Sequence, residues 1–170
     1  MEIIKYKISR YGKSPLVGVK IKEGQQWASI KYNEVDYIID GIRYINTKYI
    51  CRQTKVEAND MVAKVIPLKY NDVLKDRELV GRLNLDSYYG FFCDLIPMGF
   101  LVEIGLDKED CIYVGTITKV NEKSVTFDTI GTFAEDTGMM NIPFDRIRYI
   151  SIETDYLNSL DLYLRHQKRK

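Results

Sequence analysis

Three short stretches contain residue types that carry chemistry in other proteins. Asp136-Thr137-Gly138 has the carboxylate turn that an aspartic protease needs, and Gly12-Lys13-Ser14 has the end of a phosphate-binding loop. Residues 107–110, "DKED", concentrate carboxylates that could bind a divalent cation. Whether any of them acts depends on partners elsewhere and on the elements that hold them.

The Asp-Thr-Gly stretch lacks the second copy that its chemistry requires. An aspartic protease pairs two carboxylates that share one proton, and the matching part of the first half, "IDGI", offers Asp40 without a threonine. A homodimer could supply a second copy. We interpret the stretch as a turn in which Asp136 accepts backbone N–H bonds and Gly138 takes the left-handed conformation.

The other two stretches also lack required parts. A phosphate-binding loop needs a glycine five positions before Gly12, where this chain has Lys7, and "PLVGVKI" after the loop predicts a strand instead of a helix. Residues 107–110 show no ordered spacing of oxygen ligands, which favours a solvated hairpin loop. We expect no metal and no cofactor.

Cysteine and histidine give no nucleophilic site. Cys51, Cys93 and Cys111 are far apart and form no C-x-x-C pair, so we expect reduced, buried thiols without a disulfide or zinc site. His166, the single histidine, lies in the basic C-terminal tail, away from any packed serine or cysteine. The sequence therefore predicts that the protein is not an enzyme.

Composition favours a β-rich, globular chain. Of the 170 residues, 45% are hydrophobic and 13 are tyrosine, and no apolar run approaches about 18 residues, so no membrane span and a cytoplasmic location are expected. The net charge is +1, but residues 1–56 carry 11 Lys/Arg and 5 Asp/Glu (+6), whereas residues 57–170 carry 14 and 19 (−5). The two halves have opposite charge.

The first half, residues 1–68, reads as a strand meander followed by a helix. Period-two alternation in "EIIKYKIS" and "LVGVKIKEG" indicates half-buried strands, and Asp40-Gly41 between apolar runs predicts a hairpin. From Glu57 the apolar residues fall at helical spacing until Pro67. Residues 69–85 show no strong period and are expected to connect the halves.

The second half, residues 86–170, repeats this plan. Asp86 or Ser87 is a suitable N-cap for a helix that Pro97 stops, and five alternating segments follow. Thr154 then caps an amphipathic C-terminal helix. The same order of elements in both halves suggests an internal repeat.

These patterns resemble small β-barrels of the Sm-like and Src-homology-3-like kind. The resemblance lies in "YVGTITKVNEKSVTF", which matches bent central strands, and in "IPFDRIRYISI", which matches the last two strands. The whole chain resembles an uncharacterised bacterial group of tandem small barrels. It implies a mainly β fold with a few helices: two tandem five-stranded barrels, each followed by a helix. The turns of Sm-type RNA sites are absent, so no RNA-binding residue is implied.

Two surface features are candidate binding sites. If the apolar residues of the first two strands point inward, four lysines share one outer face: Lys5, Lys7, Lys20 and Lys22. In the next strand, inward Ala28 and Ile30 leave Trp27 and Lys31 outward, where the tryptophan could stack on a base or anchor a protein. The alternative is a partly buried tryptophan at a barrel rim, and a bulge would reverse the alternation.

From these observations we expect a non-catalytic interaction protein that binds through a strand edge or the basic face. Its partner is a protein or another copy of the chain, because open barrels leave edge strands that a second strand can extend. The alternatives are an Sm-like binder of RNA or single-stranded nucleic acid, and an inhibitor or immunity-type protein.

Overall fold

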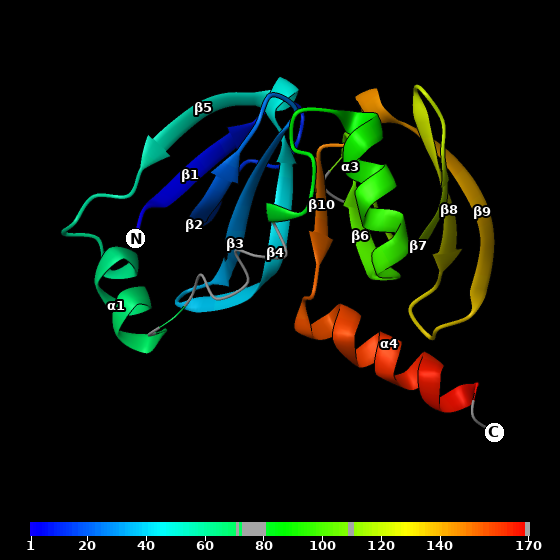
Figure 1. The fold of residues 1–170 in the computed structure, drawn as a ribbon. Coiled ribbons are helices and arrows are strands. Elements are labelled where there is room, and N and C mark those ends of the chain that lie inside the picture. The colour runs from blue at the N-terminus through cyan, green and yellow to red at the C-terminus, as the bar shows by residue number, and fades with distance from the viewer. Residues whose placement is uncertain (71, 73–80, 109–110, 169–170) are drawn as a thin grey trace.

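The fold is mainly β, with helices on both faces of one ten-stranded antiparallel sheet (Figure 1). We describe it from a computed structural model of residues 1–70, 72, 81–108 and 111–168. The expectation of a β-rich fold with a few helices is confirmed.

The first half contributes five strands and one helix. The strands are β1 (Ile3–Ile8), β2 (Leu16–Glu23), β3 (Trp27–Val35), β4 (Ile38–Asn46) and β5 (Ile50–Lys55). A short 3-10 turn, η1 (Thr47–Tyr49), separates the last two strands, and helix α1 (Met61–Lys69) follows them.

The second half contributes two helices and five strands. They are α3 (Tyr88–Leu95), β6 (Leu101–Gly105), β7 (Ile112–Val120), β8 (Ser124–Ile130), β9 (Asp136–Pro143), β10 (Tyr149–Ile152) and α4 (Asp155–Gln167). The 3-10 turns η2 (Ile96–Met98) and η3 (Phe144–Arg146) precede β6 and β10.

The sheet is open, and the two expected five-stranded barrels are not observed. The strand order is β5-β1-β2-β3-β4-β10-β6-β7-β8-β9. A barrel closed within the first half would pair β4 with β5, but β4 pairs with β10 of the second half instead. This pairing joins both halves into one sheet and leaves β5 and β9 at its ends.

Side-chain caps define the helix starts, as the sequence predicts for two of the three. The side chains of Asp60, Ser87 and Thr154 accept the backbone N–H groups of residues 62, 90 and 157. The expected stop at Pro67 is wrong, because α1 continues through it to Lys69. Proline is tolerated in this exposed, short helix, although its ring removes one backbone donor.

The predicted hairpin at Asp40-Gly41 is also wrong. Both residues lie inside β4, and the turn falls at Asp36, whose φ is +47°. Gly41 has φ +66° and passes so close to the Ile152 carbonyl that a Cβ would collide with it. The glycine therefore marks a close approach of β4 to the end of β10, its neighbour in the sheet, while the Asp40 carboxylate accepts the Asp155 N–H at 2.7 Å.

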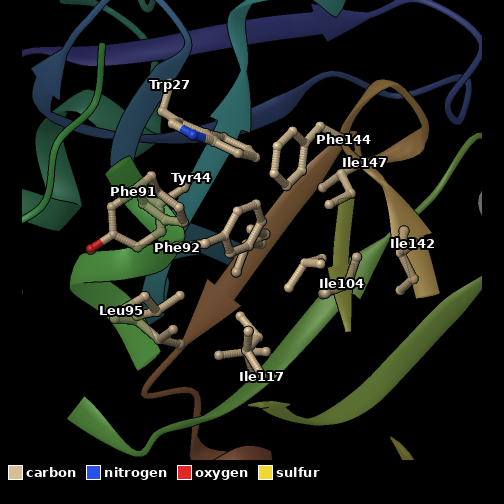
Figure 2. Close-up of a cluster of buried hydrophobic side chains, with 14 of the residues drawn as sticks. Trp27, Tyr44, Phe91, Phe92, Leu95, Ile104, Ile117, Ile142, Phe144 and Ile147 are labelled. Atoms are coloured by element: carbon tan, nitrogen blue, oxygen red, sulfur yellow. The ribbon is translucent and has the colours of Figure 1, made fainter. Parts of the chain in front are cut away.

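The main core lies between α3 and the sheet (Figure 2). Trp27 and Tyr44 from the first half meet Phe91 and Phe92 of α3, so residues of both halves fill one cluster. On the same face, α1 covers Ile3 and the start of β2, whereas α4 covers β6 and β7 on the opposite face. Burial from both halves makes the sheet a single packed unit.

Part of the expected connecting segment is packed against this core. Leu83 and Leu85 are buried, and the Leu85 carbonyl accepts the N–H groups of Gln26 and Trp27. Of the connection that we expected at 69–85, positions 71 and 73–80 lie outside the described residues.

Candidate functional site

The junction between the halves is a short antiparallel ladder of four residue pairs. Ile45 lies opposite Tyr149 and Ile42 lies opposite Ile152, with two pairs between them. We call this ladder the junction. In it, β4, at the end of the five strands of the first half, pairs with β10 of the second half.

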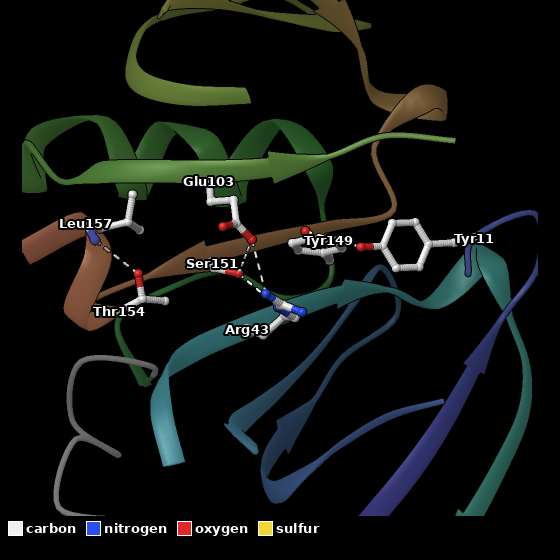
Figure 3. Close-up of polar contacts among 7 residues, drawn as sticks. All are labelled: Tyr11, Arg43, Glu103, Tyr149, Ser151, Thr154 and Leu157. Atoms are coloured by element: carbon white, nitrogen blue, oxygen red, sulfur yellow. Dashed lines mark hydrogen bonds and ion pairs between the residues drawn. The ribbon is translucent and has the colours of Figure 1, made fainter. Parts of the chain in front are cut away.

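A buried ion pair reinforces the junction (Figure 3). The Arg43 guanidinium lies 3.0 Å from Glu103 Oε1, and its Nε donates to Ser151 Oγ at 2.9 Å. The side chains of Arg43 and Glu103 are only 8% and 17% exposed. The guanidinium also lies 3.6 Å from the ring centre of Tyr32 and 4.0 Å from that of Tyr149. The guanidinium, the Ser151 hydroxyl and the Glu103 carboxylate thus bind one another, which suits a structural role.

Two tyrosines close the cluster toward the first loop. Tyr11 and Tyr149 meet edge to face, and their hydroxyl oxygens are 3.3 Å apart. Burial raises the pKa of both phenols above the ordinary tyrosine value. Both therefore stay neutral at physiological pH and contribute packing and hydrogen bonding.

The β5 edge is the first of two edges that are open among the described residues. β5 pairs with β1, and most of its residues, including Arg52 and Gln53, are exposed. Val56, just beyond the strand, donates its N–H to the Ile3 carbonyl. Because N–H direction alternates along a strand, the N–H groups of Gln53 and Lys55 point away from β1.

The β9 edge is the second. β9 pairs with β8, and six of its eight residues are exposed, with Met139 at 77%. A long edge strand with an exposed apolar side chain is a template for another strand. Phe133, in the β8–β9 connection, is 87% exposed close to the same edge.

The expected lysine face does not exist, because the register places the lysines on opposite faces. Lys5 lies opposite Val17, so it shares the face that α1 covers. Lys20 alternates with Val17 and Val19 and therefore points to the other face. The apolar residues of β1 and β2 were wrongly assigned to one side, since Ile4 and Val19 belong to different clusters.

Several of these lysines also have partners. Lys5 Nζ lies 3.3 Å from Asp60 Oδ2, and Lys20 Nζ lies 2.5 Å from Glu23 Oε2. Lys7 donates to the carbonyls of Gly12 and Lys13, in the loop that resembled a phosphate-binding motif. Lys22 is exposed beyond a bulge, and Lys31 is 8% exposed. The six candidate residues therefore form no single surface.

Trp27 points to the predicted side of its strand but is not exposed there. Ala28 and Ile30 lie in the cluster on one face, as expected, and Trp27 lies on the other. That face is covered by α3, so Trp27 is 0% exposed and packs 4.8 Å from the ring centre of Phe91. Alternation identifies a face, but it cannot tell that a distant helix covers it. A binding role for Trp27 is incompatible with this burial.

The Asp-Thr-Gly stretch is not the predicted hairpin turn, because its three residues begin strand β9 at a shift in register with β8, but the local contacts expected of Asp136 and Gly138 are present. Asp136 Oδ1 accepts the Gly138 N–H at 2.7 Å, and Gly138 has φ +90°. Thr137 donates to the hydroxyl of Thr129 at 2.8 Å. The stretch begins the exposed β9 edge, and the sequence has no second Asp-Thr-Gly.

The metal-binding and thiol candidates can be placed only in part. Residues 109 and 110 of "DKED" lie outside the described residues. Elsewhere in the described ranges, no three His, Cys, Asp or Glu side chains gather closely enough to hold a metal ion. Cys51 is exposed on β5, contrary to the expected burial, because it lies on an edge strand, whereas Cys93 and Cys111 are half-buried.

One cavity combines aromatic, basic and acidic residues, the last being Glu122 and Asp145. It has a volume of about 380 Å³ and lies beside the stacked rings of Tyr88 and Phe144, whose centres are 5.6 Å apart. Lys48 comes from η1 and Lys123 from the β7–β8 turn. No motif in the sequence pointed to this cavity, because its residues come from four separate segments.

Comparison with protein-family models, with curated proteins and with solved structures finds no match to this chain. Within its described residues, none of the helices has the length and apolar character that crossing a bilayer requires.

Proposed function

We propose that the protein is a non-catalytic, cytoplasmic interaction protein that binds an extended strand of a partner at its free sheet edges. The observation that carries this proposal is the β9 edge, with six exposed residues and a 77% exposed Met139. Such an edge gives affinity through backbone hydrogen bonds and specificity through alternate side chains. The junction supports it, since there the sheet already accepts a strand from another unit.

The proposal retains the small-barrel interpretation at the level of each half. The two halves have the same relative strand order, and each ends in a helix that packs on its own first two strands. This arrangement supports two duplicated modules that share a sheet instead of closing separately.

The test is a comparison of edge variants in capture from the native host, read by quantitative mass spectrometry. Asn141→Pro removes a backbone donor from β9, and Asn141→Ala keeps it. We expect a partner that is enriched with the wild type and Asn141→Ala and lost with Asn141→Pro. A partner that ignores Asn141→Pro, or a wild type that captures nothing, would contradict edge binding.

The second candidate is an Sm-like role in binding RNA or single-stranded nucleic acid. The cavity beside Tyr88 and Phe144 favours it, because aromatic rings stack on bases and Lys48 and Lys123 could contact phosphates. Binding of a fluorescent RNA pool should then weaken with salt and with Lys48→Gln/Lys123→Gln. The absence of binding at low salt would exclude it.

An inhibitor or immunity-type role is a special case of the first proposal. It predicts a stable complex with one protein in the native host. Recovery of the native protein as a free species would count against it.

A further inference from the structure

The two free edges occupy the same places in their halves as the two strands that meet at the junction. Counted along the sheet, the first half runs β5-β1-β2-β3-β4 and the second runs β10-β6-β7-β8-β9. In this order along the sheet, which differs from the order along the chain, β4 and β9 stand last in their halves and β5 and β10 stand first. The junction joins a last strand to a first strand, which leaves one of each kind free.

The residue registers of the two halves correspond as well as their order. Gly18 lies opposite Tyr32, and Gly115 lies opposite Thr129. At both glycines an added Cβ would collide with a carbonyl oxygen of the neighbouring strand. The register then shifts at the same distance beyond each glycine, between residues 20 and 22 in β2 and between 117 and 119 in β7. These shared irregularities align the halves residue by residue.

The alignment extends through β1 and β6 to β5 and β10. Ile4 lies opposite Gly18 and Val102 lies opposite Gly115, so Ile4 corresponds to Val102. Ile4 also lies opposite Lys55, and Val102 lies opposite Ile152. Lys55 of the free β5 edge therefore corresponds to Ile152 of the junction.

The same alignment reaches β4 and β9 at the other end of each half. Tyr32 corresponds to Thr129, so Lys31 corresponds to Asp128 one residue earlier. Lys31 lies opposite Ile42, and Asp128 lies opposite Met139. Met139 of the free β9 edge therefore corresponds to Ile42, and Gly138 corresponds to Gly41, which also has a positive φ.

We propose that β9 of one copy of the protein pairs antiparallel with β5 of a second copy in the register of the junction. Ile42 lies opposite Ile152 there, so Met139 lies opposite Lys55 of the second copy, and Asn141 lies opposite Gln53. This inference rests on the proposed function, because it names a second copy as the strand that the edges bind.

Backbone donors face outward at the required positions. Asn46 donates its N–H to the Arg148 carbonyl across the junction, so the N–H of Tyr44, two residues earlier, has the same direction. Asn141 corresponds to Tyr44, and its N–H therefore points out of the β9 edge. The Gln53 N–H points out of the β5 edge, and both side chains are exposed. Pro143 stands at the Asn46 position, so the new ladder lacks one donor at that end.

The charges of the two ends favour this pairing. Residues 1–56 carry a net +6 and residues 57–170 a net −5. The β5 edge bears Arg52 and Lys55, and the β9 edge begins at Asp136. Because the contact joins different ends, it continues from copy to copy into a ring or an open chain, and salt weakens it.

Two single-edge variants test the pairing by light scattering after size exclusion. Asn141→Pro blocks β9 and leaves β5 intact, while Gln53→Pro blocks β5 and leaves β9 intact. We expect the wild type to grow beyond twice its 19.8 kDa mass with concentration, and each proline variant to stay monomeric. An equimolar mixture should form a species of twice the monomer mass, because one intact edge of each kind remains. Asn141→Ala and Gln53→Ala should associate like the wild type.

Three outcomes would overturn the inference. The first is a wild type that stays monomeric at every concentration; if it still captures a strand-dependent partner from its host, the proposed function stands without self-pairing. The second is association that the proline variants retain. The third is a mixture of variants that stays monomeric although the wild type associates.

A charge variant keeps the test decisive if a proline variant melts below its alanine control. Arg52→Glu/Lys55→Glu changes two exposed side chains and gives the β5 edge the sign of the acidic half. We expect it to be monomeric at low salt, and association equal to that of the wild type would overturn the inference.

Discussion

Arg43 offers the sharpest test of how the halves are joined, because its charge is buried together with that of Glu103. The change is Arg43→Met, which keeps a long side chain and matches Met140, the residue at the corresponding position of the second half. Removing one member of a buried ion pair costs about 3–5 kcal/mol, since the other charge is left without a partner. Glu103 keeps 17% of its side-chain exposure, so we expect about 3 kcal/mol.

The double variant Arg43→Met/Glu103→Met should be more stable than the sum of its parts. Glu103→Met alone leaves the guanidinium unpaired and also costs about 3 kcal/mol. With both charges gone, no desolvated charge remains, and the main loss is the contact of the guanidinium with Tyr32 and Tyr149, about 2 kcal/mol at most. The interaction energy is then about 4 kcal/mol.

Urea unfolding followed by circular dichroism measures these free energies in a double-mutant cycle. Lys20→Met is the control, because its ion pair with Glu23 is more exposed and contributes about 1 kcal/mol or less. Additive costs of about 6 kcal/mol in the double variant would refute the view that the buried pair joins β4 to the second half.

Three further predictions concern the core, a helix cap and a close contact between two strands. Trp27→Ala should lower the free energy of unfolding by about 3–5 kcal/mol. In the wild type, the emission of this single tryptophan should be blue-shifted and resist quenching by acrylamide. Quenching like that of free tryptophan would contradict its burial. The pKa of Asp60 is lowered, mainly because its carboxylate accepts the Val62 N–H and also because it pairs with Lys5, so its contribution is present above the ordinary Asp pKa and lost as pH falls through the folded value. Asp60→Asn keeps the cap hydrogen bond but removes the charge. The variant should therefore be less stable than the wild type near neutral pH and equally stable in acid, where Asp60 is protonated. A difference in stability that persists in acid would refute the assignment to charge. Gly115→Ala should cost about 1–3 kcal/mol because its Cβ would overlap the Asp128 carbonyl, whereas Gly81→Ala, with open space around it, should be nearly neutral; equal melting temperatures would contradict the close approach.

Local chemistry predicted much of the fold because its signals act over a few residues. Ser87 and Thr154 cap their helices as expected, and alternation placed Trp27 and Ala28 on opposite faces of β3. The contact of Asp136 with the Gly138 N–H and the positive φ of Gly138 were also predicted, although these residues begin a strand and form no hairpin turn.

The failures concern pairings between distant segments. Nothing local to β4 tells that it pairs with β10 and leaves the barrel open, and nothing in "WASIKY" tells that α3 covers Trp27. The lysine face was lost through the relative register of β1 and β2, because a shift of one residue reverses every side chain. The free edges were predicted in kind, but their identity as β5 and β9 depends on the complete strand order.

The most direct test of the central claim, that the free edges bind strands in the register of the junction, is disulfide trapping between two variants. Lys55→Cys and Met139→Cys, each in a Cys51→Ser background, place one thiol on each edge at positions that the register sets opposite each other. Cα atoms of opposed residues are about 5.5 Å apart, which suits a disulfide. Oxidation of this mixture should give a disulfide-linked heterodimer. A control mixture of Lys55→Cys with Asn141→Cys, which is two residues out of register, should give far less. Equal linking of both mixtures, or none, would contradict the claim.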